Sequence, residues 1–201
     1  MQRKTIVLLA VIGVIVFIGL GLFAWVTGTY NALVKLDEGV NQAWAQVQNQ
    51  YQRRFDLIPN LVATVKGYAQ HEREVFENVA EARSSVGKIN VTPEILNNPQ
   101  VFRQFQDAQA SLSSALTRLL AVVENYPQLK ANENFLQLQA QLEGTENRIA
   151  VERQRFNQVV QEFNTRIRSF PISMIAGMFG FGSKQYFQAE TGAEKAPQVK
   201  F

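Results

Sequence analysis

The sequence predicts an all-α protein, in which an N-terminal transmembrane helix is followed by an elongated antiparallel bundle of three long helices and a short fourth helix. Residues 5–26 carry no charge, apolar residues recur every three or four positions through most of the chain, and no strand alternation or hairpin motif competes with that period. We therefore expect residues 1–4 as a cytoplasmic N-terminus, 5–26 as the span, 30–187 as the bundle and 188–201 as a disordered tail.

The uncharged run is long enough to cross a bilayer. As a helix it would rise about 33 Å, close to the ~30 Å thickness of the hydrocarbon, and a helix satisfies its own backbone there. A cleaved signal peptide is the alternative, because small residues stand at Thr27 and Gly28. We favour a retained anchor, since the apolar part of a secretory signal usually extends over about 7–15 residues.

Charge around the span predicts its orientation. Arg3 and Lys4 precede it, whereas the twenty residues that follow hold only Lys35, opposed by Asp37 and Glu38. The positive-inside rule then places the N-terminus in the cytoplasm and the chain from about residue 28 outside it.

Two aromatic residues mark the point at which the span leaves the hydrocarbon. Trp25 and Tyr30 have amphipathic rings that suit the membrane interface. With Arg3 and Lys4 they form the expected membrane-interface set.

Composition excludes several function classes. The chain has no cysteine, so disulfides, thiolate metal sites and cysteine nucleophiles are absent. Without Arg3 and Lys4, the chain has 18 of its 20 basic residues left, against 17 acidic residues. The exported part is nearly neutral, and we expect no nucleic-acid partner.

The first long helix is predicted over residues 31–86. Pro59 lies within it, has no N–H for the carbonyl of Phe55, and crowds the preceding turn with its ring. We therefore expect a kink or a short break near residues 57–59. The first loop is expected at residues 87–98. The apolar stripe of this helix comprises Leu33, Leu36, Val40, Trp44, Val47, Tyr51, Ile58, Leu61, Val65, Tyr68, Val75, Val79 and Val86.

Two further helices are marked by their first and last residues. Asn98 and Pro99 supply an N-cap and a first-turn proline for a helix that ends at residues 125–127. Asn132 is the expected N-cap of the next helix, which Pro171 stops. Short loops make successive helices antiparallel. By that count the third helix leads away from the membrane, and Phe170 is expected at the pole farther from the anchor.

An apolar segment with several glycines follows Pro171. It either folds back as a short helix that closes the bundle, or it remains an exposed patch for a partner or a lipid surface. We favour closure of the bundle, because an exposed apolar patch of this size is uncommon on a soluble domain. The candidate patch residues are Ile172, Met174, Ile175, Met178, Phe179 and Phe181.

Several unusual strings occur in one order along the chain. They are Tyr30-Asn31-x-Leu33-Val34, Ala43-Trp44, Gln50-Tyr51-Gln52-Arg53-Arg54-x-Asp56-Leu57-Ile58-Pro59-Asn60-Leu61-Val62, Val65-Lys66-Gly67-Tyr68-Ala69-x-His71-Glu72, Tyr126-Pro127-x-Leu129-Lys130-Ala131-Asn132-x-Asn134-Phe135 and Thr145-Glu146-Asn147-Arg148-Ile149-Ala150. Together they resemble the LemA family of bacterial membrane proteins, from the anchor to Phe187.

The resemblance implies a single-pass protein of the bacterial inner membrane with an extracytoplasmic helical bundle. It supplies no activity. The association of the family with membrane metalloproteases and envelope-stress proteins implies an accessory role.

The sequence lacks the constellations that catalysis or cofactor binding needs. His71 is the only histidine, and His71-Glu72 lacks the second histidine of a zinc protease helix at Val75. The glycines near the C-terminus lack the lysine and the preceding strand of a phosphate loop. We therefore expect no enzyme activity, no cofactor and no small-molecule substrate.

Polar residues cluster inside two of the predicted helices. They form either a solvated face with ordinary intrahelical pairs or a buried ionic network that fixes helix register. Both interpretations stay open, because Arg53 and Arg54 point in different directions and only one can face the bundle. The candidates are Arg53, Arg54, Asp56, Pro59, Asn60, Glu146, Asn147 and Arg148.

The function that we expect is that of a membrane-anchored scaffold or adaptor, which acts through protein partners and self-association at the cell envelope. A slender rod has a large lateral surface for such contacts. The first alternative is a lipid-binding or membrane-remodelling protein that uses residues 172–181. The second is an accessory subunit of a membrane protease or other enzyme.

Overall fold

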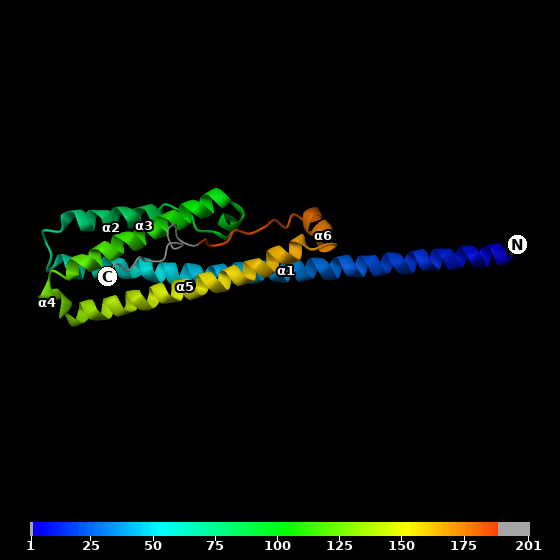
Figure 1. The fold of residues 1–201 in the computed structure, drawn as a ribbon. Coiled ribbons are helices and arrows are strands. Elements are labelled where there is room, and N and C mark those ends of the chain that lie inside the picture. Colours follow the sequence, from blue (N-terminus) through cyan, green and yellow to red (C-terminus); the bar gives the residue numbers. More distant parts are fainter. Residues whose placement is uncertain (1, 189–201) are drawn as a thin grey trace, which may run out of the picture.

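The computed structural model describes residues 2–188, apart from the side chains of Gln2 and Lys4, and is largely helical (Figure 1). Its elements are α1 (Gln2–Lys66), α2 (Arg73–Gly87), a 3-10 helix (Pro93–Asn97), α3 (Pro99–Val123), α4 (Pro127–Lys130), α5 (Glu133–Arg168) and α6 (Ile172–Met178). Residues 2–188 contain no strand, so the predicted all-α class is confirmed.

The apolar N-terminal segment and the bundle share one helix. In the described part of the chain, α1 is the one helix that is long and apolar enough to cross a membrane. Its large apolar side chains between Ile6 and Phe23 are 48–78% exposed. Farther along, the same helix is buried at Leu33, Val40 and Trp44. No loop therefore separates the apolar segment from the domain.

The first helix does not end as the sequence predicted. It continues through Pro59 without a break and ends at Lys66. Pro59 lies on the exposed side of α1, where water can replace the hydrogen bond that its ring removes. The chain turns instead at residues 67–72, where Ala69 is fully buried and its N–H donates to the carbonyl of Val65 at 2.9 Å. The predicted helix over residues 31–86 is therefore two antiparallel helices.

This extra turn reverses the predicted polarity. The bundle has four long helices, with α1 packed along α5 and α2 along α3 (Figure 1). The C-terminal end of α5 therefore lies at the pole near the anchor. Our prediction that Phe170 lies at the far pole was wrong, because it counted one helix too few. The far pole, where α4 lies, is called the distal pole below.

Local signals placed the starts of α3 and α5 correctly, whereas the 3-10 helix lies in the predicted loop and α4 was not predicted. The Asn98 side chain accepts hydrogen bonds from the N–H groups of Gln100 and Val101, and Asn132 accepts one from Phe135. Both predicted N-caps are confirmed. The short helix after Pro171 is also present as α6, which buries Ile172, Ile175 and Ala176 against the bundle.

The core consists of two clusters stacked along the bundle. The anchor-side cluster includes Leu33, Val40, Trp44, Val47, Tyr51, Phe102, Phe105, Ile149, Phe156, Val160, Phe163 and Phe187. The distal cluster includes Ile58, Leu61, Val65, Val79, Leu112, Leu116, Leu119, Val123, Leu129, Phe135 and Leu142.

The boundary between the clusters falls at one level on three helices. It lies between Tyr51 and Ile58 on α1, between Phe105 and Leu112 on α3, and between Leu142 and Ile149 on α5. Polar residues occupy that level, and the candidate site is built around them.

Candidate functional site

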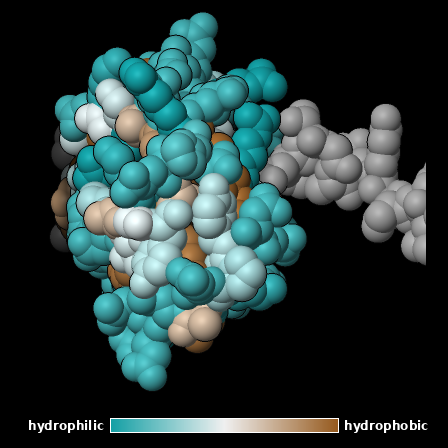
Figure 2. All heavy atoms as spheres, turned by 90° about the vertical axis from the view of Figure 1, so that its left-hand side faces the viewer, coloured by the Kyte–Doolittle hydropathy of each residue, from teal (hydrophilic) through white to brown (hydrophobic). Residues whose placement is uncertain are grey.

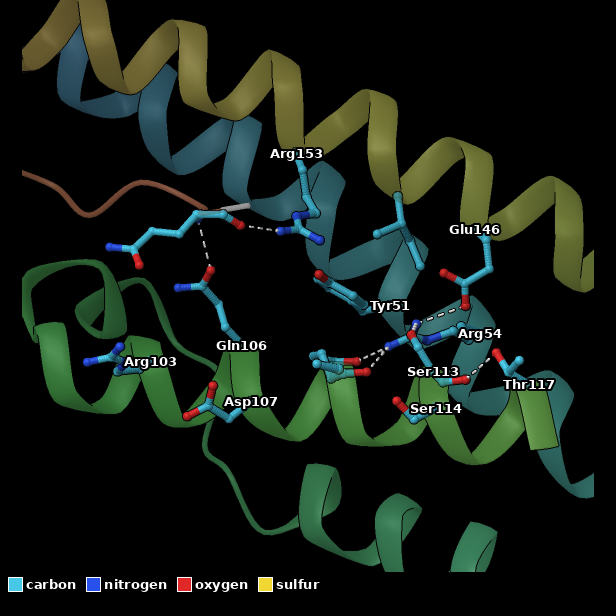
Figure 3. A pocket seen from close by; sticks show the side chains of 14 residues that line it. Tyr51, Arg54, Arg103, Gln106, Asp107, Ser113, Ser114, Thr117, Glu146 and Arg153 are labelled. Carbon is cyan, nitrogen blue, oxygen red and sulfur yellow. Dashed lines mark hydrogen bonds and ion pairs between the residues drawn. The ribbon is translucent and has the colours of Figure 1, made fainter. Parts of the chain in front are cut away.

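Arg54 is the centre of a polar layer that crosses the bundle. Its side chain is 2% exposed, and it reaches from α1 to both α3 and α5 (Figure 3). Nη1 donates to Ser113 Oγ at 2.7 Å and to Glu146 Oε1 at 2.8 Å. Nη2 donates to the side-chain carbonyl of Gln109. Arg54, Gln109, Ser113 and Glu146 are called the polar layer below.

The polar layer links the helices in a single register. A buried guanidinium is costly to desolvate, and charge-assisted hydrogen bonds offset that cost only when their geometry is good. The ring of Tyr51 adds a cation-π contact, with the Arg54 Cζ atom 5.2 Å from its centroid. A slip of one helix by a turn would leave the charge of Arg54 without its acceptors.

The polar candidates from the sequence separate into two groups. Arg54 and Glu146 are brought together by the fold, as the network interpretation required. Asp56 lies on the exposed face, where it accepts a hydrogen bond from Gln52 Nε2 at 2.7 Å. The other candidates are also exposed: Arg53, Pro59, Asn60, Asn147 and Arg148.

Sequence reasoning missed the α3 half of the polar layer. Gln109 interrupts the apolar stripe of α3 between Phe105 and Leu112, and it is 6% exposed. A buried glutamine in such a position needs a hydrogen-bond partner. That interruption was the signal that could have identified it.

A groove of about 440 Å³ lies between α3 and α5 beside the polar layer (Figure 3). Tyr51 and Arg54 of α1 contribute to its lining. The α3 side presents Arg103, Gln106, Asp107, Gln109, Ala110, Ser113, Ser114 and Thr117, and the α5 side presents Glu146, Ile149 and Arg153. Gln188 also lines the groove. The groove therefore contains both hydrogen-bond donors and acceptors, with three arginines and two carboxylates among its lining residues.

Residues 181–188, called the C-terminal strap below, run from α6 along the bundle toward this groove (Figure 1). Asn164 of α5 binds the backbone N–H and carbonyl of Lys184, and Asn157 binds both backbone groups of Phe187. Each asparagine thus satisfies a peptide group that helix or sheet would otherwise satisfy.

Side chains of the strap add to this attachment. Phe187 is 6% exposed and stacks on Trp44, with ring centroids 6.0 Å apart. The Lys184 Nζ atom lies 2.8 Å from Asp37 Oδ1 of α1. Gln188, which we expected to begin a disordered tail, donates its N–H to Gln106 Oε1 at 3.1 Å. That expectation was wrong for Gln188; residues 189–201 lie outside the described part of the chain.

The predicted apolar patch is divided by α6. Ile172 and Ile175 are buried against the bundle, and Phe181 is partly buried. Met174, Met178 and Phe179 are exposed by 64%, 81% and 50%. Closure of the bundle therefore accounts for one face of α6 and leaves the other uncovered.

Of the expected membrane-interface residues, Trp25 is 43% exposed and Tyr30 is 38% exposed. Tyr30 contacts Phe179, with ring centroids 4.8 Å apart. Arg3 is exposed. The side chain of Lys4 lies outside the described residues.

A four-helix bundle that shares its first helix with an apolar segment of membrane-spanning length defines a membrane-associated helical protein. In the part of the chain that the structure describes, no group of three or more His, Asp or Glu side chains could hold a metal ion. The chain belongs to the LemA family, whose model matches residues 43–201. The resemblance seen in the sequence is thus confirmed.

Three relatives illustrate the breadth of this similarity. The chain is 24% identical to magnetosome protein MamQ 2 of Paramagnetospirillum magneticum, over 94% of this chain and 74% of the relative. It is 26% identical to magnetosome protein MamQ of Magnetospirillum gryphiswaldense, over 85% and 70%. It is 24% identical to protein LemA of Metamycoplasma hominis, over 87% and 75%.

Proposed function

We propose that this protein is a membrane-anchored adaptor whose groove between α3 and α5 binds an extended segment of a partner protein. The N-terminus lies in the cytoplasm and the bundle beyond the opposite face of the bacterial inner membrane. We propose no catalytic step. The lateral surface of the bundle remains available for association with further copies of the same chain.

The observation that carries the proposal is the way in which the bundle holds its own strap. Asn157 and Asn164 bind the peptide groups of Phe187 and Lys184. These hydrogen bonds are made to backbone atoms, so they do not require a particular side chain in the bound segment. This surface is therefore suited to extended backbone. The groove begins where the strap reaches Gln188, so a second extended segment would continue along the same face.

The groove supplies the chemistry that such a segment needs. Peptide groups require donors and acceptors at short intervals. Ser114 and Thr117 supply hydroxyl groups, Asp107 supplies an acceptor and Arg153 supplies donors. The mixture of signs favours a polar peptide over an anionic ligand such as a nucleic acid.

The continuity of α1 supports the anchoring role. The uncharged run of α1 has membrane-spanning length, and the positive residues that precede it favour a cytoplasmic N-terminus. Since α1 carries Arg54 as well as the span, a partner bound in the groove would be held at a fixed distance from the membrane.

Photocrosslinking in intact cells tests the proposal. A benzophenone amino acid is placed at Ser114, inside the groove, and in a matched variant at Leu136, which is exposed on α5 outside the groove. We expect Ser114 to crosslink to one contiguous segment of another polypeptide, identified by mass spectrometry, and Leu136 not to do so. Products that map only to residues 189–201 of the same chain, or that match those from Leu136, would refute partner binding.

A further inference from the structure

The anchor-side pole of the bundle carries an exposed apolar surface. Residues 169–183 contain no charged side chain. Within them Phe170 is 82% exposed, and Met174, Met178 and Phe179 are exposed by 64%, 81% and 50%. These four residues are called the α6 surface below. Four large apolar side chains so close together exceed the scattered exposure that is ordinary on a soluble domain.

The geometry of α6 sets this surface outward. Ile172, Ile175 and Ala176 lie at helical spacing and are buried against the bundle, so Met174 and Met178 occupy the opposite face. Gly180 then adopts a φ of +77°, which favours glycine, and the N–H of Phe181 donates to the Ala176 carbonyl at 2.9 Å. This turn holds Phe179 at the end of the helix.

The α6 surface lies close to the end of the membrane-spanning segment. Phe179 and Phe181 contact Tyr30, with ring centroids 4.8 Å and 5.9 Å from the ring of Tyr30. Tyr30 follows Val26, the last residue of the predicted span, by four residues, or about 6 Å of helix. Beyond α6 only α1 extends toward the N-terminus (Figure 1).

The two poles of the bundle differ in polarity. Figure 2 looks onto the distal pole, and hydrophilic side chains cover most of that face with small apolar spots between them. At the anchor-side pole the exposed groups instead include methionine and phenylalanine, and Trp25, five residues before Tyr30 on α1, is 43% exposed. Arg166 and Arg168, both exposed in the last turn of α5, precede the uncharged segment.

We propose that the α6 surface enters the interface of the same bilayer that α1 spans. This inference rests on the membrane anchor of the proposed function. Phe170, Met174, Met178 and Phe179 bury their apolar side chains at the boundary between headgroups and acyl chains, and Arg166 and Arg168 face anionic headgroups. The structure favours the bilayer as the partner of this surface, because Phe179 contacts Tyr30 and Tyr30 lies just beyond the span on α1.

This second contact orients the groove relative to the membrane. A single spanning helix leaves a domain free to rotate about the helix axis. The α6 surface lies to one side of α1, so its insertion selects one side of the bundle to face the lipid. The groove between α3 and α5 then keeps one rotational position about the α1 axis.

Spin labels at single cysteines test the inference, since the chain has no native cysteine. The full chain is reconstituted in vesicles of phosphatidylethanolamine and phosphatidylglycerol, with labels in M178C, V16C and N125C variants. Accessibility to oxygen and to a water-soluble nickel chelate is measured for each. Val16 lies in the uncharged run, and Asn125 follows α3 at the distal pole.

We expect the ratio of oxygen to nickel accessibility at Met178 to exceed that at Asn125 several-fold and to approach that at Val16. A Met178 label as accessible to nickel as the Asn125 label, with Val16 in lipid, overturns this inference and leaves the anchor intact. Protection of Met178 from both reagents also overturns it, because a protein then covers the surface. A water-exposed Val16 label overturns the anchor and the inference together.

Discussion

Asn164 holds the backbone of Lys184 at both of its polar groups. The Asn164 Nδ2 atom donates to the Lys184 carbonyl at 2.9 Å, and its Oδ1 atom accepts from the Lys184 N–H at 2.9 Å. Asn157 repeats the arrangement with Phe187. Seven residues of helix rise about 10.5 Å, and three residues of extended chain cover about 10 Å. The spacing of the two asparagines thus matches that of the peptide groups they hold.

Replacing Asn164 by alanine should release the strap locally while the bundle stays folded. Two hydrogen bonds to partly buried backbone are lost, and we expect opening of the strap to become easier by about 1–2 kcal/mol. Hydrogen exchange of the Lys184 amide measures this directly. Asn147→Ala, at an exposed position of the same helix, is the control and should leave that amide unchanged. Equal exchange in both variants would contradict the role of Asn164.

Replacing Arg54 by alanine should destabilise the whole bundle. Glu146, Gln109 and Ser113 would lose their shared donor, and removal of one partner from a buried pair costs about 3–5 kcal/mol. Since Glu146 is 39% exposed and water can solvate it, we expect a loss near the lower value. Chemical unfolding of the full chain in detergent, followed by circular dichroism, checks this.

Arg53 is the matched control for Arg54, because it is adjacent in α1 and exposed. Arg53→Ala should change the free energy of unfolding by no more than about 0.5 kcal/mol. Similar losses in the two variants would mean that the polar layer adds no specific stability.

Replacing Pro59 by alanine should stabilise the protein. Helix α1 continues through Pro59, which leaves the Phe55 carbonyl without its helical donor, and the exposed ring leaves no core cavity when it is removed. We expect a gain of about 1–3 kcal/mol in the free energy of unfolding, against at most about 0.7 kcal/mol for Asn60→Ala. Thermal unfolding of both variants measures these changes in stability. A neutral or destabilising effect of Pro59→Ala would refute the prediction.

Tyr126 should make stability fall at alkaline pH. Burial raises the pKa of its phenol, and the hydrogen bond that it donates to Glu72 at 3.2 Å raises the pKa further. A raised folded-state pKa stabilises the protein below the unfolded value of about 10, and that contribution is lost as pH rises through the folded pKa. Tyr126→Phe should therefore lose less stability between about pH 9 and 12. Unfolding midpoints over that range measure it, and identical pH dependence in both proteins would exclude the effect.

Helix starts could be predicted because their signals are local. Asn98 and Asn132 cap their helices through their own side chains, so a few residues of sequence contain the information. The turn after Lys66 has no comparable mark. Gly67 is a weaker helix breaker than Pro59, and the packing of α2 against α3, which the turn permits, depends on residues far along the sequence.

The candidate site could be predicted only in part. Arg54 and Glu146 stood out as charges inside apolar patterns, but their meeting depends on the phase of two helices far apart in the sequence. Gln109 and Ser113 belong to a helix that the sequence had not connected with them. The C-terminal strap is neither helix nor strand, because the side-chain amides of Asn157 and Asn164 bind its backbone. Its sequence therefore shows no helical or strand periodicity, and its attachment to the bundle was not predicted.

The unbroken course of α1 makes the molecule a lever. Bilayers that differ in thickness tilt a spanning helix by different amounts. From Tyr30 to Lys66 the helix extends about 54 Å, so each 10° of tilt would swing the distal pole by about 9 Å. With α1 spanning a bilayer, as proposed, a change in lipid composition would be converted into lateral displacement of whatever the far end carries.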